Sequence, residues 1–234
     1  MSRVTQHVLL VLLGLATAVM LVKGTYLNYV KPSLLPWLAV AAVVLVVLGL
    51  SGVVAELRGA AEDGHGHAHR SGLAWLLLVP IALVAFVVPP PLDARGTNPP
   101  PAAVSTPTLR PFPPLPPGPA PEVPLPEAVM RAAADSAHSL DGRTITLTGF
   151  TVHRSSGVDL GRVVIICCAA DAQLARVHLS GVGSDAAAGY PEDTWVRVTG
   201  RIQPGSSHAE DGFIPTMDVT EATRVDKPKN AYAY

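Results

Sequence analysis

Charged side chains are scarce in this 234-residue sequence, and they are scarcest near the N-terminus. Asp, Glu, Lys and Arg make up 15% of the residues, against about 25% in a typical soluble domain. Between residues 8 and 54 the only strongly charged side chains are Lys23 and Lys31. A segment so poor in charge is typical of a chain that lies in lipid.

An excess of positive charge is also lacking. The net charge is −1, and residues 127–234 carry 10 Lys and Arg against 13 Asp and Glu, a net of −3. Proteins that bind nucleic acid present a basic surface, often with stacked aromatic side chains. This charge balance argues against nucleic acid as a partner.

Catalytic signatures are missing as well. The sequence has no P-loop, no G-x-S-x-G elbow and no H-E-x-x-H motif. Its long apolar runs contain no Asp or Glu, which would mark an ion pathway through a membrane. We therefore expect a protein that is not an enzyme, and one that is not a transporter by itself.

Three apolar runs predict a membrane region over residues 1–88, with two to three spans. Residues 8–29 include a short run extended by Tyr26 and Tyr29, which suit the membrane interface. Residues 34–54 form an uncharged run of the length that spans a bilayer. Residues 73–88 are shorter and contain Pro80, which a neighbouring helix can accommodate. We expect small residues, Gly14, Gly49 and Gly52, to pack these spans against a partner protein.

Two questions about the membrane region stay open. The first run can instead be a signal peptide, with Arg3 before it and a cleavage site at residues 16–18. Orientation is undecided, because three basic residues flank the spans on either side (Arg3, Arg58 and Arg70 against Lys23, Lys31 and Arg95). With three spans and a cytoplasmic N-terminus, the C-terminal domain is extracytoplasmic; with two spans it is cytoplasmic. We expect a multi-pass protein of the plasma membrane with an extracytoplasmic C-terminal domain.

Residues 89–126 form a proline-rich linker, with 16 of the chain's 23 prolines. Such a segment is extended and acts as a semi-rigid spacer. After it, residues 127–234 read as a soluble β-rich domain with a helix over 127–140. Short runs of strand character predict a small all-β, OB-like barrel; these runs are residues 144–152, 162–168, 174–179, 195–202, 214–219 and 222–225.

The adjacent cysteines, Cys167 and Cys168, are the most unusual local feature. Neighbouring side chains of a strand point to opposite faces, so one thiol should enter the core and the other face outward. Both thiols can bind one metal ion only if the strand ends or bulges there, and the residues AAD that follow could supply that break. The pair is then either two small buried apolar residues or a metal-binding or redox site. For a site, Asp171, His153 and His178 are the candidate companions.

Three alternating histidines, His65, His67 and His69, lie in the His-rich loop 62–70 between the second and third apolar runs. Imidazoles spaced in this way in a glycine-containing loop can bind a divalent metal such as zinc, with Glu62 and Asp63 beside them. The alternative is a polar loop without a ligand.

The sequence resembles the YcgQ-like family of permease subunits over nearly its whole length. The most specific match is the run Ile166–Ala172, ICCAADA; weaker matches are Thr148–Phe150, Trp195–Gly200, Pro215, Val219, Pro228, Tyr232 and Tyr234. The resemblance implies short N-terminal spans, a conserved C-terminal domain, a multi-span permease partner and a connection with metal homeostasis. It marks Cys167, Cys168 and Asp171 as the positions of interest.

Three hypotheses follow for the function. The first is an accessory subunit of a two-component membrane permease, with the lipid bilayer and a multi-span permease as partners. The second is a membrane-anchored protein that captures metal with the loop at His65–His69. The third is a thiol-redox sensor that uses Cys167 or Cys168.

Overall fold

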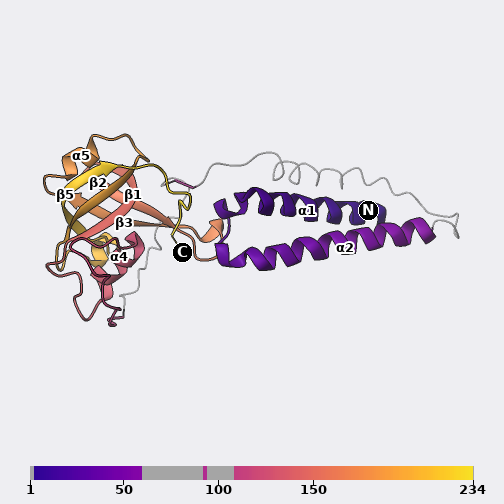
Figure 1. The fold of residues 1–234 in the computed structure, drawn as a ribbon, viewed down its shortest axis with the longest axis horizontal. Coiled ribbons are helices and arrows are strands. Elements are labelled where there is room, and N and C mark those ends of the chain that lie inside the picture. Colours follow the sequence, from indigo (N-terminus) through magenta and orange to yellow (C-terminus); the bar gives the residue numbers. More distant parts are fainter. Residues whose placement is uncertain (1–2, 60–91, 94–107, 234) are drawn as a thin grey trace. The chain divides into compact units, whose positions relative to one another are not determined.

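The computed structural model describes residues 3–59, 92–93 and 108–233. The chain divides into two compact units, residues 1–91 and 92–234, which are considered separately (Figure 1). The predicted third span, residues 73–88, and the histidines of the 62–70 loop lie outside the described residues.

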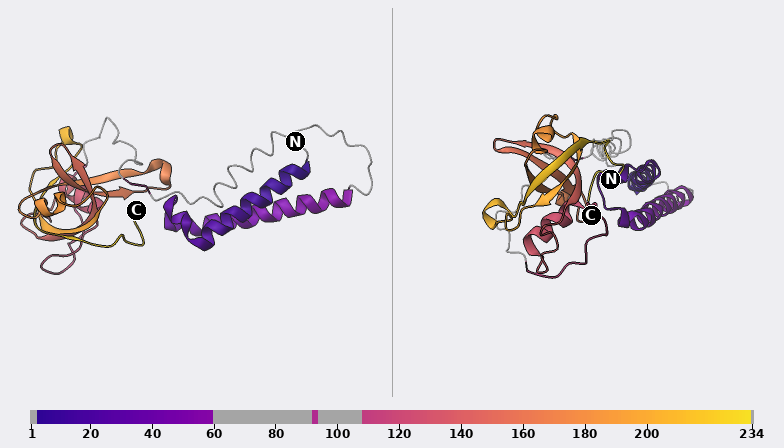
Figure 2. Two further views of the ribbon diagram at one scale, coloured as in Figure 1. Left: turned by 90° about the horizontal axis from the view of Figure 1, so that it is seen from above. Right: turned by 60° about the vertical axis from the view of Figure 1, so that its left-hand side comes forward.

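The N-terminal unit contains a hairpin of two long apolar helices, α1 (Arg3–Lys23) and α2 (Leu35–Gly59). Short 3₁₀ turns, η1 (Thr25–Asn28) and η2 (Pro32–Leu34), connect them. Gly24 adopts a left-handed φ of 71° and ends the first helix, a conformation that glycine takes at little cost. Figures 1 and 2 show the two helices side by side.

Both helices are long and apolar enough to cross a membrane. The segments Val4–Lys23 and Pro32–Arg58 have mean hydropathies of 2.0 and 2.8. At 1.5 Å per residue the helices are about 31 Å and 37 Å long, close to the hydrocarbon thickness of a bilayer. The two apolar helices expected from the sequence are present with shifted limits. The first begins at Arg3 and ends at Lys23, against residues 8–29 predicted, and the second extends to Gly59, beyond residue 54.

Glycines bring α1 and α2 into close contact. A Cβ atom on Gly49 would lie 2.6 Å from Val11 Cγ2, and one on Gly14 would lie 2.7 Å from Val46 Cγ2. A Cβ on Gly52 would overlap the ring of His7. We expected these glycines to face a partner protein, and that was wrong: they are used inside the hairpin, where only a hydrogen atom fits.

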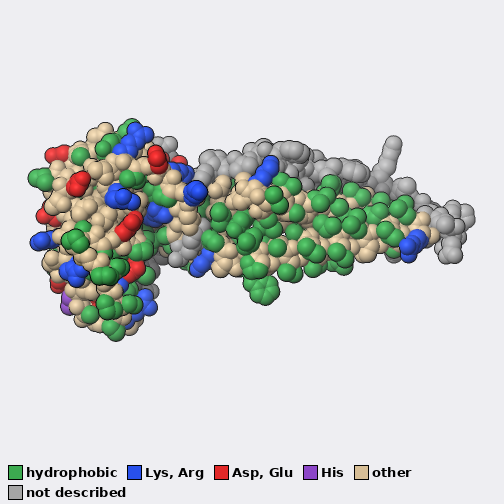
Figure 3. Space-filling model, in the orientation of Figure 1, with side chains coloured by type: hydrophobic (Ala, Val, Ile, Leu, Met, Phe, Trp, Pro, Cys, Tyr) green, Lys and Arg blue, Asp and Glu red, His purple; other side chains and the backbone are tan. Residues whose placement is uncertain are grey.

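Most of the hairpin's other apolar side chains point outward. Trp37, Val43 and Val47 are 70%, 62% and 57% exposed, and Figure 3 shows apolar side chains along both helices. An exposed apolar surface of this extent requires a cover of lipid or protein.

The C-terminal unit is built on one mixed five-stranded sheet. In chain order its elements are α4 (Leu125–Ala134), β1 (Ile145–Arg154), β2 (Gly157–Val164), η4 (Ala169–Asp171), β3 (Gln173–Ser180), α5 (Ser184–Ala188), β4 (Trp195–Ile202), η5 (Ala209–Asp211) and β5 (Thr216–Arg224). The strand order β1-β2-β3-β5-β4 closes on itself, because β4 also pairs with β1. All neighbours are antiparallel except β3 and β5.

Alternating apolar residues of the strands fill the interior of this closed sheet. Ile145, Leu147, Leu160 and Val198 are fully buried there, together with Leu125 at the start of α4. A second apolar cluster contains Phe150, Val152, Val163, Ile165, Ala172, Trp195 and Tyr232. Val123 is also part of the main core, so the packed unit takes in residues that the sequence assigned to the proline-rich linker.

Several element limits differ from those predicted. The second strand covers Gly157–Val164 instead of residues 162–168, because the buried Asp159 interrupts the apolar pattern at its start. The helix α4 ends at Ala134 and not at residue 140. The two short strands predicted over 214–225 form one strand, β5, which is irregular opposite Thr199 and Gly200.

Candidate metal centre

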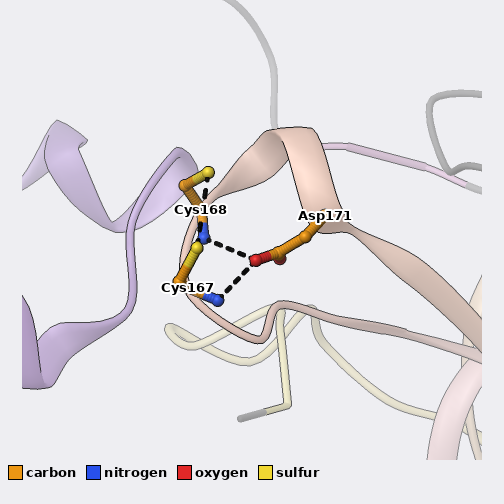
Figure 4. A group of neighbouring side chains, drawn as sticks. All are labelled: Cys167, Cys168 and Asp171. Carbon is orange, nitrogen blue, oxygen red and sulfur yellow. Dashed lines mark hydrogen bonds between the residues drawn. The ribbon is translucent and has the colours of Figure 1, made fainter.

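The two adjacent cysteines lie in a loop that begins where β2 ends. The last extended residue is Ile165, whose N–H donates to the carbonyl of Ala233 at 3.0 Å. Beyond it the chain turns, and the side chain of Asp171 closes the turn from its far end (Figure 4). Asp171 Oδ1 accepts the N–H of Ile166 at 2.9 Å, and its Oδ2 accepts those of Cys167 at 2.8 Å and Cys168 at 3.3 Å.

This turn places both thiols at the surface. Cys167 is exposed and Cys168 is half-buried, and their Sγ atoms are 3.7 Å apart. The expectation that one thiol enters the core was therefore wrong, and so was the alternative of two buried apolar residues. The reason is that the regular strand ends at Val164, before the pair, so the alternation of a strand no longer applies.

Three potential ligand atoms converge in this loop. The two Sγ atoms and a carboxylate oxygen of Asp171 all lie within 4.8 Å of one another. Two thiolates bound to one tetrahedral zinc ion at about 2.3 Å would be about 3.8 Å apart, and the observed separation is 3.7 Å. The sulfur positions therefore suit a shared thiophilic ion without a change in backbone.

The electrostatics of the loop disfavour a free thiolate. The pKa of Cys167 is raised to about 11, first because its thiol hydrogen-bonds to Asp171 and next because it hydrogen-bonds to Cys168. The same thiol contact is the main cause that lowers the pKa of Asp171, and backbone N–H groups of residues 166–168 add to it. The carboxylate is thus the anion of the site, and it attracts a cation while it holds a proton on the neighbouring sulfur.

The other histidines named from the sequence are not brought into this group. His178 Nδ1 lies 2.9 Å from Asp159 Oδ1, and His153 Nε2 lies 2.9 Å from the carbonyl oxygen of Tyr190. Among the residues that the structure describes, the potential metal ligands that converge in this loop are therefore Cys167, Cys168 and Asp171.

Sequence reasoning named these three residues but missed the way Asp171 acts on the loop. An Asp three residues after a candidate turn start often accepts backbone N–H groups there. This spacing was the available signal. The prediction from sequence also missed the charged cluster around Asp159. The available signal was a charged residue inside an apolar strand pattern.

The C-terminal unit is thus a small mixed-sheet domain with an exposed loop that carries two thiols and a carboxylate. Residues 127–234 match the family model described as the DUF1980 C-terminal domain. Residues 127–234 are therefore similar to this family's C-terminal domain, and the Cys167 loop falls inside the matched region. No curated protein and no solved structure matched the chain.

Proposed function

We propose that this protein is a membrane-anchored accessory subunit of a two-component permease, and that it presents a divalent metal ion such as zinc to its partner. The ion would be held by Cys167, Cys168 and Asp171. The observation that carries the proposal is the convergence of these three ligand atoms within 4.8 Å at an exposed loop. Structural zinc sites usually have four protein ligands, so three candidate ligands at an exposed loop suit capture and transfer better than permanent structural binding.

The thiol-redox alternative is the weaker one. Reactive cysteines lie in electropositive surroundings that lower the pKa of the thiol. Here the neighbour is a carboxylate, and the pKa of Cys167 is raised to about 11. A dication would reverse this effect, since its charge stabilises both thiolates at once. We assign no catalytic role to the domain.

Membrane anchoring by the hairpin is the second part of the proposal. The apolar windows of Val4–Lys23 and Pro32–Arg58 are only 17% and 11% buried, so most of their surface needs lipid. We propose that α1 is retained in the mature protein. Gly14 and Gly49 lie where α1 contacts α2, and a larger residue at either position would not fit there. The site of action would be the plasma membrane, with the third span over 73–88 and an extracytoplasmic C-terminal domain.

The permease partner is proposed on the resemblance to YcgQ-like subunits alone. We also propose that the closed sheet is an OB-like barrel. This interpretation is supported by the strand order β1-β2-β3-β5-β4 and by the helix α5 between β3 and β4. Co-purification of a multi-span protein with the full chain from membranes would support the subunit role, and a chain that is recovered alone would count against it.

Zinc titration of the full chain in detergent tests the metal site. We expect saturable binding to the wild type and its loss in a Cys167→Ser, Cys168→Ser double variant. The matched control replaces His65, His67 and His69 with Ala; if this variant alone loses zinc, binding belongs to the histidine loop. Copper and nickel titrations under the same conditions determine the preferred ion.

A topology map tests the sidedness. A reporter fused after residue 130 should be active on the extracytoplasmic side if three segments cross the bilayer and the N-terminus is cytoplasmic. Cytoplasmic activity would contradict that arrangement, and a second reporter at the N-terminus would then distinguish two spans from the opposite orientation.

A further inference from the structure

A second polar site lies at the other end of β2 from the cysteines. A cleft of ≈ 470 Å³ is lined by side chains of β1, β2 and β3 and of the loop between β4 and β5, including Arg154, Asp159, Arg176, His178, Glu210 and Asp211. Asp159 is five residues before Val164, which places it about 17 Å along the strand from the start of the cysteine loop. The cleft is therefore separate from the candidate metal centre.

Asp159 is the centre of this cluster. Its side chain is 6% exposed. Asp159 lies opposite His178 in the register of the neighbouring strands β2 and β3. Its Oδ1 is 2.9 Å from His178 Nδ1, and its Oδ2 is 3.4 Å from Arg176 Nη1. Arg154 Nε is 3.8 Å from the same Oδ2. One buried carboxylate therefore orients an imidazole and two guanidinium groups.

Two arginines and one carboxylate, Asp159, lie together on the strands that line the cleft, whereas Glu210 and Asp211 line it from the loop between β4 and β5. Arg154 and Arg176 share the single carboxylate of Asp159, and the side chain of Arg176 is 12% exposed. The pKa of Arg176 is lowered, first by its burial and next by the repulsion of Arg154. Each guanidinium group has five N–H donors, so the two arginines that line the cleft have more donors than the carboxylate of Asp159 can accept.

His178 adds a third group that can hydrogen-bond to an anion. Its Nδ1 hydrogen-bonds to Asp159, so Nε2 is the ring nitrogen that a ligand in the cleft could contact. Nε2 can donate to an oxyanion when the ring is charged, or accept from a protonated one when it is neutral. Glu210 and Asp211 are exposed and also line the cleft, and they repel ligands with many negative charges.

We propose that this cleft binds one small oxyanionic group, a phosphate or a carboxylate, through Arg154, Arg176 and His178. Asp159 is the positioning residue that holds the three donors together. The guanidinium and imidazole donors would bind the anion by charge-assisted hydrogen bonds, and the acidic residues of the cleft disfavour ligands with many negative charges. This site is independent of the metal proposed at Cys167 and Cys168.

Calorimetric titration of the full chain in detergent tests the proposal, with inorganic phosphate and acetate as probes at constant ionic strength. We expect saturable binding of at least one anion. Arg176→Met should weaken it about tenfold to a hundredfold, as expected for loss of charge-assisted hydrogen bonds. The matched control is Arg197→Met, an exposed arginine on β4 outside the cleft, which should leave the affinity unchanged.

Two further variants keep the test decisive. If Arg176→Met does not fold, Arg154→Met replaces it, because the Arg154 side chain is 49% exposed and its loss should spare the fold. Arg154→Lys should retain part of the affinity, since the charge stays while the planar fork is lost. The proposal is overturned if the folded wild type binds neither anion, or if Arg154→Met and Arg197→Met have equal effects.

Discussion

The hairpin and the C-terminal unit use the same apolar side chains in opposite ways. In α2, Val43 and Leu48 are 62% and 55% exposed, whereas Ile145 and Leu160 of the sheet are fully buried. The hairpin gains its internal contacts where glycine lets two backbones approach. The sheet gains them where branched side chains fill an interior. The hairpin thus leaves most of its large apolar side chains at its surface, whereas the sheet encloses them.

Their chemistry differs in the same way. Ionisable side chains are few in α1 and α2, so these helices offer few groups that could bind a metal ion or transfer a proton. The C-terminal unit has two thiols and a carboxylate in the loop after β2, and a buried ion cluster on β2 and β3. We propose that the C-terminal unit carries the chemistry and the hairpin the attachment, and the following variants test this division.

The largest effect is expected from shortening a leucine in each region. Leu160→Ala removes a fully buried side chain from the core of the sheet, so the free energy of unfolding should fall by about 2–5 kcal/mol. Leu48→Ala, at a side chain that is 55% exposed, should change it by less than about 0.5 kcal/mol. Urea denaturation of the two variants, followed by circular dichroism in detergent, makes the comparison. Equal losses would refute the assignment of Leu48 to a lipid-facing surface.

Zinc affinity should depend steeply on pH if the thiols bind the ion. The raised pKa of Cys167, about 11, means that it is a protonated thiol at pH 6–9 and must release that proton on binding. Affinity should therefore increase with pH, by about tenfold per pH unit for each thiol that has to lose its proton. Competition with a chromophoric zinc chelator measures the slope. A flat profile would mean that the thiols are not ligands.

Asp171→Asn should make Cys167 more reactive and the loop a poorer metal site. Loss of the carboxylate lowers the raised pKa of Cys167 toward its usual range, so alkylation by iodoacetamide at pH 8 should accelerate by about tenfold to a hundredfold. Zinc binding should weaken in parallel. Asp185→Asn, at an exposed carboxylate of α5, is the control and should alter neither rate nor affinity. Slower alkylation of Asp171→Asn would contradict the role given to the carboxylate.

Gly49→Leu tests the packing of the hairpin. The new side chain would begin 2.6 Å from Val11 Cγ2, so α1 and α2 must separate, at a cost of about 1–3 kcal/mol. Nuclear Overhauser contacts between the His7 ring and Gly52 in micelles should disappear. Val43→Leu adds bulk at an exposed position of the same helix and should preserve them. If both variants keep the contacts, the glycine is not what allows the close approach.

Much of the fold could be predicted from local patterns, and the rest depends on distant contacts. Apolar length located both hairpin helices, and alternation located strands such as Trp195–Ile202 within a residue or two. The start of β2 was missed because Asp is common in turns and rare in buried strands. Asp159 is buried in β2 because Arg176 and His178 of the neighbouring strand β3 pair with it. A buried charge is tolerated only with such partners, and no local window contains them.

The candidate site shows the same limit. The residue types and their closeness in sequence pointed to Cys167, Cys168 and Asp171, but the strand was extended through them. What ends the strand is the set of three backbone N–H groups that Asp171 accepts. The sequence also did not determine whether the glycines of the spans face the neighbouring helix or a partner protein. Both kinds of contact favour the same small residues.

The smallest effect is expected where the chain enters the C-terminal unit. Leu92 is the first residue of this unit, and its N–H donates to the hydroxyl of the buried Tyr232 at 2.6 Å. Tyr232→Phe keeps the ring in the second apolar cluster and removes the acceptor, so unfolding should become easier by about 1 kcal/mol.

Urea denaturation measures this difference against Tyr190→Phe, whose hydroxyl makes no hydrogen bond among the described residues and which should behave as the wild type. Limited proteolysis adds a local readout, because loss of the bond should speed cleavage near Leu92 before the sheet unfolds. Unchanged stability and unchanged cleavage in Tyr232→Phe would mean that the C-terminal tail does not hold the start of the unit. The division between attachment and chemistry would then lie further along the chain, at Val123 and Leu125, where the main core begins.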